Sequence, residues 1–157
     1  MKKKNITVIL IIIAASALFY IMQPKKGSFN DLILSQYQGK NFTQVQINYI
    51  PTDSDLAEFT CKDKNKINEF ISYLETLKLV EANGSIYYGK STNYYIFIRN
   101  EVKNSEGQLH ANENLGITVY GNNLNIIDIF NNNHTKTYKI VNGKFDMKYI
   151  REIMKKS

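Results

Sequence analysis

The sequence predicts an α+β fold in which an N-terminal transmembrane helix precedes one domain built on an antiparallel sheet. An uncharged run occupies Ile6–Met22, and a later segment, 64–78, repeats apolar residues at helical spacing. From about residue 85 to 141, short strand-like segments follow one another without an intervening helix, which favours an antiparallel meander over a doubly wound parallel sheet. With 157 residues, 43% of them hydrophobic, the chain suits one domain and is too apolar to be wholly disordered.

The apolar run near the start predicts a membrane anchor. As a helix it would rise about 25 Å, at the short end of what crosses a hydrocarbon core of about 30 Å. Lys2–Lys4 precede it and Lys25 and Lys26 follow it, so the positive-inside bias slightly favours a cytoplasmic N-terminus. The predicted organisation is a cytoplasmic start (1–5), a transmembrane signal anchor (6–23), a linker (24–28) and an extracytoplasmic domain (29–157).

Two other interpretations of this run remain open. Ala15–Ala17 fits the small-residue pattern of a signal-peptide cleavage site, and cleavage after Ala17 would release a secreted protein. Against cleavage, Leu18–Met22 continues the apolar run past that site. A buried core helix is the third interpretation, and it is disfavoured because such helices are rarely apolar on every face.

The charge of the chain gives little support to a nucleic-acid partner. The formal net charge is +6, but residues 1–23 contain three lysines and no acid, which leaves 17 basic and 14 acidic residues in the rest. Much of the basicity therefore belongs to the flank of the apolar run, and we expect no nucleic-acid binding. The single Cys61 excludes an internal disulfide framework.

Alternating apolar and polar residues predict most of the strands. Segments 42–50 and 57–61 read as a hairpin, and further strands are expected around 94–99, 117–130 and 137–141. Asp63 is a suitable N-cap for the helix 64–78. A short C-terminal helix is expected over 146–156, and residues 29–37 are consistent with one or two helical turns. The polar segment 100–114 is left open as a hairpin tip or a loop.

The sequence predicts no catalytic residue, no metal ligand and no cofactor. Cys61 falls on the apolar side of a predicted strand, where a small buried hydrophobe is its ordinary role. His110 and His134 lie 24 positions apart in polar sequence. Together with Glu113 and Asp128 they match no recognised metal-ligand spacing.

Four tyrosines form the candidate binding face. Tyr87, Tyr88, Tyr94 and Tyr95 occur as two pairs within or beside predicted strands. Because adjacent strand residues point to opposite faces, one tyrosine of each pair is expected to face solvent. Exposed tyrosine is a common contact residue at interfaces, although aromatic pairs also stabilise sheets between strands.

The general plan resembles the small, singly anchored extracytoplasmic proteins of Gram-positive bacteria. The resemblance rests on Lys2–Lys4, on Ile6–Met22 and on the compact α+β domain, and it includes no diagnostic motif. It implies a location at the cell surface and transfers no site residues.

Three classes of function are carried forward. The leading hypothesis is a non-enzymatic interaction module, held in the lipid bilayer through Ile6–Met22, that binds a protein, a peptide or a cell-wall component. The second is an inhibitor or immunity-type protein that acts on an exported enzyme or toxin through a loop such as 100–114. The third is an enzyme of the cell envelope whose residues converge only in three dimensions.

Overall fold

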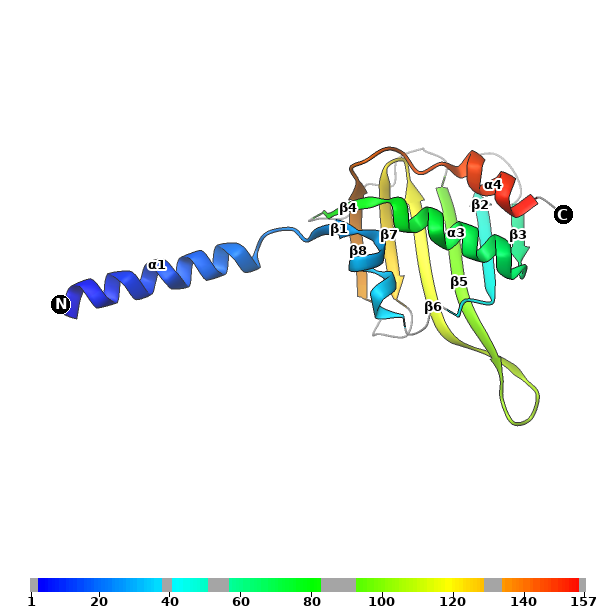
Figure 1. Cartoon of the computed structure of the whole chain (residues 1–157), viewed down its shortest axis with the longest axis horizontal. Coiled ribbons are helices and arrows are strands. Elements are labelled where there is room, and N and C mark those ends of the chain that lie inside the picture. The colour runs from blue at the N-terminus through cyan, green and yellow to red at the C-terminus, as the bar shows by residue number, and fades with distance from the viewer. Residues whose placement is uncertain (1–2, 38–40, 51–56, 83–92, 129–133, 156–157) are drawn as a thin grey trace.

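The computed structural model describes residues 3–37, 41–50, 57–82, 93–128 and 134–155. These form an antiparallel sheet with helices at one face, as the sequence predicts (Figure 1). The elements in chain order are α1 (Lys3–Ile21), β1 (Lys26–Ser28), α2 (Phe29–Leu32), the 3-10 turn η1 (Leu34–Gln36), β2 (Gln44–Ile50), β3 (Ala57–Cys61), α3 (Lys64–Thr76), β4 (Lys78–Glu81), β5 (Asn93–Lys103), β6 (Leu109–Tyr120), β7 (Asn123–Asp128), β8 (His134–Ile140) and α4 (Met147–Lys155).

The eight strands lie in the order β1-β4-β8-β7-β6-β5-β2-β3, and every neighbouring pair is antiparallel. The predicted hairpin of β2 and β3 occupies one edge of the sheet. Strands β5 to β8 form a meander that returns to β4 near the other edge (Figure 1). Helix α3 joins the two edges, since it follows β3 and precedes β4.

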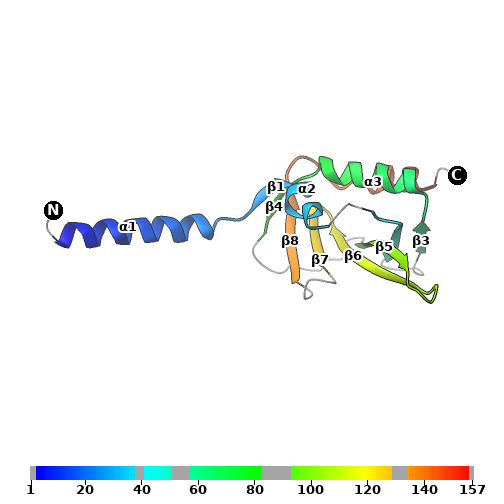
Figure 2. The same ribbon diagram turned by 60° about the horizontal axis from the view of Figure 1, so that its bottom comes forward.

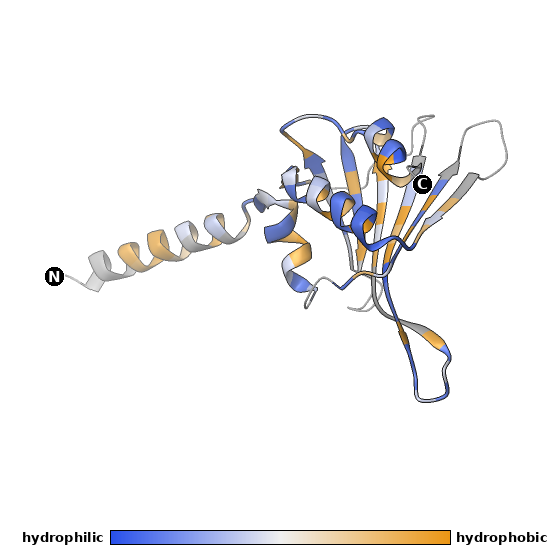
Figure 3. Cartoon of the chain, turned by 45° about the vertical axis from the view of Figure 1, so that its right-hand side comes forward, coloured by the Kyte–Doolittle hydropathy of each residue, from blue (hydrophilic) through white to orange (hydrophobic). Residues whose placement is uncertain are grey.

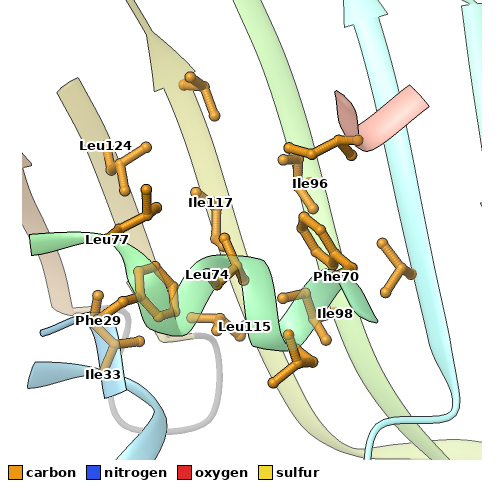
Figure 4. Close-up of a cluster of buried hydrophobic side chains, with 14 of the residues drawn as sticks. Phe29, Ile33, Phe70, Leu74, Leu77, Ile96, Ile98, Leu115, Ile117 and Leu124 are labelled. Atoms are coloured by element: carbon orange, nitrogen blue, oxygen red, sulfur yellow. The ribbon is translucent and has the colours of Figure 1, made fainter. Parts of the chain in front are cut away.

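One face of the sheet holds the hydrophobic core. In α3, the buried side chains Ile67, Phe70, Ile71 and Leu74 form the apolar stripe that the sequence predicts. They pack with the inward-facing residues of the central strands, which include Val45, Ile96, Ile98, Leu115, Ile117 and Leu124 (Figure 4). Burial of this kind supplies most of the stability of an amphipathic helix.

The limits of α3 follow from local chemistry. The Asp63 side chain accepts hydrogen bonds from the backbone N–H groups of Asn65 and Lys66 and so caps the first turn. The helix ends at Thr76, slightly before the predicted end, because Leu77 is already extended and leads into β4. Leu77 is nevertheless buried. It therefore packs into the core as expected, although it lies just after the helix and not within it.

The C-terminal helix α4 closes the same face. Its buried residues include Ile150, Ile153 and Met154. The Tyr73 hydroxyl of α3 accepts a hydrogen bond of 2.7 Å from the backbone N–H of Asp146, just before α4. Burial raises the pKa of Tyr73, with the nearby Asp146 charge adding to the effect. The hydroxyl therefore stays protonated and neutral at this junction.

Helix α1 confirms the expected helical conformation of the N-terminal run but contacts no other part of the fold in Figures 1 and 2, where it extends away from the sheet. Within the described residues, no helix combines the length and apolar character that crossing a membrane requires. The transmembrane helix predicted from the sequence is therefore not supported by the structure. The helix ends at Ile21, so its apolar part is about 24 Å long, below the usual thickness of the hydrocarbon core.

One segment differs from the sequence-based expectation, and a second takes one of the two forms left open for it. Lys26–Ser28, expected within a polar linker, form strand β1 and pair with β4. The polar segment 100–114 continues β5 and β6 as a regular hairpin. In both cases the sequence shows no alternation of apolar and polar residues that would predict a strand, because these strands contribute few side chains to the core.

Candidate binding surface

The longest pair of strands projects beyond the sheet. Strand β2 pairs with β5 only as far as Arg99, and β7 pairs with β6 only from Leu115 onward. Among the described strands, residues 100–114 therefore pair only with each other, and we call them the hairpin arm. Figure 1 shows the arm extending from the sheet on the side away from α4.

The tip of the arm is held by hydrogen bonds around Asn104. Its side-chain oxygen accepts from the backbone N–H groups of Glu106 at 3.0 Å and Gln108 at 2.8 Å. Its own N–H donates to the Gln108 carbonyl at 2.9 Å. Gly107 has a φ of +79°, a conformation that glycine adopts without strain. The tip is thus a defined turn with a fixed arrangement of polar groups.

An exposed leucine lies next to this turn. Leu109 has 58% of its surface exposed, although the residues flanking it along the chain are polar. Outside the N-terminal segment, only Val141 and Tyr149 are comparable among the described large hydrophobic side chains. Leu109 gives the arm an apolar contact at its outer end.

The base of the arm is fixed to β2. The pairing of β5 with β6 shifts register between Asn100 and Glu101, which is a bulge that redirects the arm. Thr43 joins the arm to β2 on both sides of this shift. Its N–H donates to the Arg99 carbonyl at 2.8 Å, and its hydroxyl accepts from the Glu101 N–H at 2.7 Å.

A depression of about 360 Å³ lies at this base, between the arm and the start of α3. The residues that line it are mostly polar, and they are Asn41, Phe42, Thr43, Lys62, Lys64, Ile67, Asn100, Glu101 and Val102. Phe42 and Ile67 belong to the core, so the floor of the depression is continuous with the packed interior.

Glu101 is the central charged group of the depression. Its carboxylate lies 3.0 Å from the Lys62 ammonium. The Gln44 amide, oriented with its nitrogen toward Glu101, lies 2.6 Å and 3.0 Å from the two carboxylate oxygens. The Glu101 carboxylate thus has both an ion-pair partner and a hydrogen-bond donor. Lys64 adds a second ammonium group to the lining. This set of groups can bind polar parts of a peptide and contains no nucleophile paired with a base.

The tyrosines of the predicted binding face lie in different surroundings. Tyr94 packs beside the core, and its hydroxyl accepts a hydrogen bond of 2.8 Å from Arg151 of α4. Tyr95 is the next residue along β5 and is half-buried on the opposite face, where no helix of the described part of the chain lies. Tyr87 and Tyr88 fall outside the described residues.

Of the residues considered for catalysis and metal binding, Asp128 lies directly opposite His134 where β7 pairs with β8, and the others lie elsewhere in the sheet. Cys61 is buried in β3, as expected for a small hydrophobe. His110 lies in β6 and His134 in β8, with β7 between those strands. Among the residues that the structure describes, no group of three or more His, Cys, Asp or Glu side chains could hold a metal ion.

Sequence reasoning offered 100–114 as the contact loop of an inhibitor-type protein, but it did not identify Glu101 as part of a site. The only usable signal was the turn chemistry of Asn104 and Gly107 within a polar stretch. No family model, curated protein or solved structure matches this chain.

Proposed function

We propose that this chain is a lipid-attached interaction module that uses the hairpin arm to contact a partner protein or peptide. The observation that carries the proposal is the exposed Leu109 beside a turn that is already ordered by hydrogen bonds. A preorganised contact segment loses little conformational entropy on binding, so more of its interaction energy is available for affinity. The depression at the base, lined by both charged and apolar side chains, would receive the neighbouring groups of the partner.

Helix α1 supports the lipid attachment. Ten of the thirteen exposed large hydrophobic side chains among the described residues lie between Val8 and Met22 (Figure 3). Ile11 is 62% exposed and Phe19 is 70% exposed. Water is a poor environment for such a surface, whereas lipid accepts apolar side chains on every side of a helix. Neighbouring lysines can reach the headgroups and compensate for the limited length of the helix.

The proposed location is the cell membrane, with the sheet-containing domain outside the cell. The lysines that precede the apolar run outnumber those that follow it, which supports this orientation. Protease added to intact cells should then digest the domain, and the same treatment should spare a cytoplasmic control protein. A domain that is digested only after lysis would contradict this orientation.

Site-specific photocrosslinking in intact cells tests the role of the arm. A photoreactive amino acid placed at Leu109 should give a discrete crosslinked product, whereas one at Val141 should not. Val141 is a matched control because it is 55% exposed and lies outside the arm. The variant Leu109→Asp should compete poorly with the wild-type chain for the same partner. Equal products at both positions, or none at position 109, would contradict the proposal.

An inhibitor-type protein is the second candidate, and the shape of the arm favours it. A narrow two-stranded projection with a fixed tip can enter a concave site on another protein, as the sheet itself cannot (Figure 1). The test is the activity of the crosslinked partner. If that partner is an exported enzyme, the full-length chain should lower its activity, and Leu109→Asp should do so less.

A further inference from the structure

A cluster of lysines lies at the sheet edge nearest to α1. Lys25, Lys26, Lys78, Lys136 and Lys139 come from β1, β4, β8 and the residue before β1, and we call this group the lysine edge. Lys26, Lys78 and Lys139 are exposed, and Lys136 keeps 46% of its side chain accessible. Figures 1 and 2 both show α1 leaving the domain at this edge.

The pairing register brings three of these lysines to one face. Lys26 pairs with Val80, and Val80 pairs with Lys139, so the three residues lie in one row across adjacent strands. Strands lie about 4.8 Å apart, which puts Lys26 and Lys139 at about 10 Å. Lys78 shares the face of Val80, two residues along β4. Since Leu79 points into the core, these lysines point away from it.

Few acidic groups neutralise the lysine edge. Among the described residues, the Glu81 carboxylate lies 3.9 Å from the Lys136 ammonium as an ion pair, and it accepts a hydrogen bond of 3.4 Å from the Lys25 backbone N–H. The Asp31 carboxylate interacts with the charge of Lys78. Two carboxylates therefore face five lysines, and the edge keeps a positive excess.

The connection to α1 keeps this edge close to whatever surrounds the helix. Lys25 is already bound to β4, because the Glu81 N–H donates to its carbonyl at 2.8 Å. Only Met22, Gln23 and Pro24 separate it from the end of α1 at Ile21. Such a segment spans at most about 14 Å. Lys25, at the near end of the lysine edge, is therefore within about two Debye lengths of that end of the helix at ordinary ionic strength.

We propose that the lysine edge lies against a bilayer surface rich in anionic lipid headgroups. The inference rests on the proposed lipid attachment of α1 and adds a lipid preference and an orientation to it. A positive surface held this close to an anionic leaflet is attracted to it, and the attraction falls steeply with added salt. The domain would then stand on its β1-β4-β8 edge, with β3 at the opposite, outer edge of the sheet.

Lysine footprinting of the full-length chain tests this orientation. The chain is reconstituted in nanodiscs of neutral phosphatidylcholine and in nanodiscs containing phosphatidylglycerol, and amine acetylation is followed by mass spectrometry. We expect acetylation of Lys25, Lys26 and Lys136 to slow roughly three- to tenfold in the anionic discs only. High salt should restore the rates. Lys66 and Lys148, on the other side of the domain, should react equally in both lipids.

Paired variants separate a lipid contact from a general effect of charge. The double variant Lys78→Gln, Lys139→Gln should lose the protection of Lys25, Lys26 and Lys136. The control double variant Lys66→Gln, Lys148→Gln removes the same amount of charge and should keep the protection of those three lysines. Equal acetylation rates in both lipids, or equal slowing at Lys66 and Lys148, would contradict the contact of the lysine edge with anionic lipid. Either result would leave the lipid attachment of α1 intact. A chain that enters neither disc would overturn the attachment and this inference together.

Discussion

Helices α1 and α3 differ both in sequence and in their surroundings. Helix α3 has one apolar stripe on an otherwise polar helix, whereas α1 is apolar on all sides. Phe70 of α3 is completely buried, whereas Phe19 of α1 is 70% exposed. The sheet provides the partner of α3. Helix α1 extends away from the sheet and meets no such partner in the described part of the chain (Figure 1).

The largest expected effect is on the free energy of unfolding, and it distinguishes a residue of α3 from a residue of α1. Phe70→Ala should lower the free energy of unfolding of the domain by about 3–5 kcal/mol, because it leaves a cavity between α3 and the sheet. Phe19→Ala removes the same atoms from an exposed position and should leave that free energy unchanged. Urea denaturation of both variants in the same detergent checks the difference. A comparable loss for Phe19→Ala would mean that α1 packs on the domain.

The next effect concerns lipid binding. Ile12→Lys places a charge near the middle of the apolar run and should weaken lipid insertion by about 3 kcal/mol. Ser72→Lys adds the same charge to an exposed position of α3 and should have no such effect. Flotation with phosphatidylcholine vesicles measures the bound fraction of each variant. Equal flotation of Ile12→Lys and the wild-type chain would contradict insertion of α1.

A smaller effect is expected at the start of α3. Asp63→Ala removes the cap that accepts from Asn65 and Lys66 and should cost about 1 kcal/mol in stability. Asn68→Ala, at an exposed position of the same helix, is the matched control. Thermal unfolding followed by circular dichroism should show a lower Tm for the first variant only. An unchanged Tm for Asp63→Ala would show that packing alone sets the start of the helix.

The smallest effect is a pH dependence between β1 and α2. The Ser28 hydroxyl and the Asp31 carboxylate form a capping box, and hydrogen bonds from Ser28 hold the pKa of Asp31 below its ordinary value of 3.8. A lowered folded-state pKa means that the carboxylate stabilises the fold above the ordinary pKa and stops doing so as the pH falls through the folded value.

Asp31→Asn should therefore reduce the loss of stability between pH 6 and pH 3, as measured by urea denaturation at each pH. Both proteins lose stability from other carboxylates in this range, so the difference between them is the informative quantity. A wild-type chain and a variant with the same pH profile would show that this capping box makes no pH-dependent contribution.

The parts of the fold that were predicted from sequence share one property. In α3, and in β2 with β3, buried residues recur at the helical or strand period, because one face packs on the core and the other meets water. Asp63 was recognised for a related reason, since a cap depends on local chemistry alone.

The parts that were missed or left open lack that contrast. In the described portion of the hairpin arm, Val102 is half-buried and Leu109 is exposed, so no alternation marks the strands. Strand β1 has three residues and depends on pairing with β4, which is 50 residues away in sequence. The contact of Glu101 with Lys62 and Gln44 also joins β5, β2 and the connection between β3 and α3, and no local pattern predicts it.

Photolabelling from within the bilayer tests the environment of α1 most directly. The full-length chain is incorporated into vesicles whose lipids carry a photoreactive group in the acyl chain, and labelled peptides are identified by mass spectrometry. Our account predicts label on the peptide containing residues 6–22 and none on the peptide from α3. Peptides from 6–22 that remain unlabelled while the chain is associated with the vesicles would contradict it.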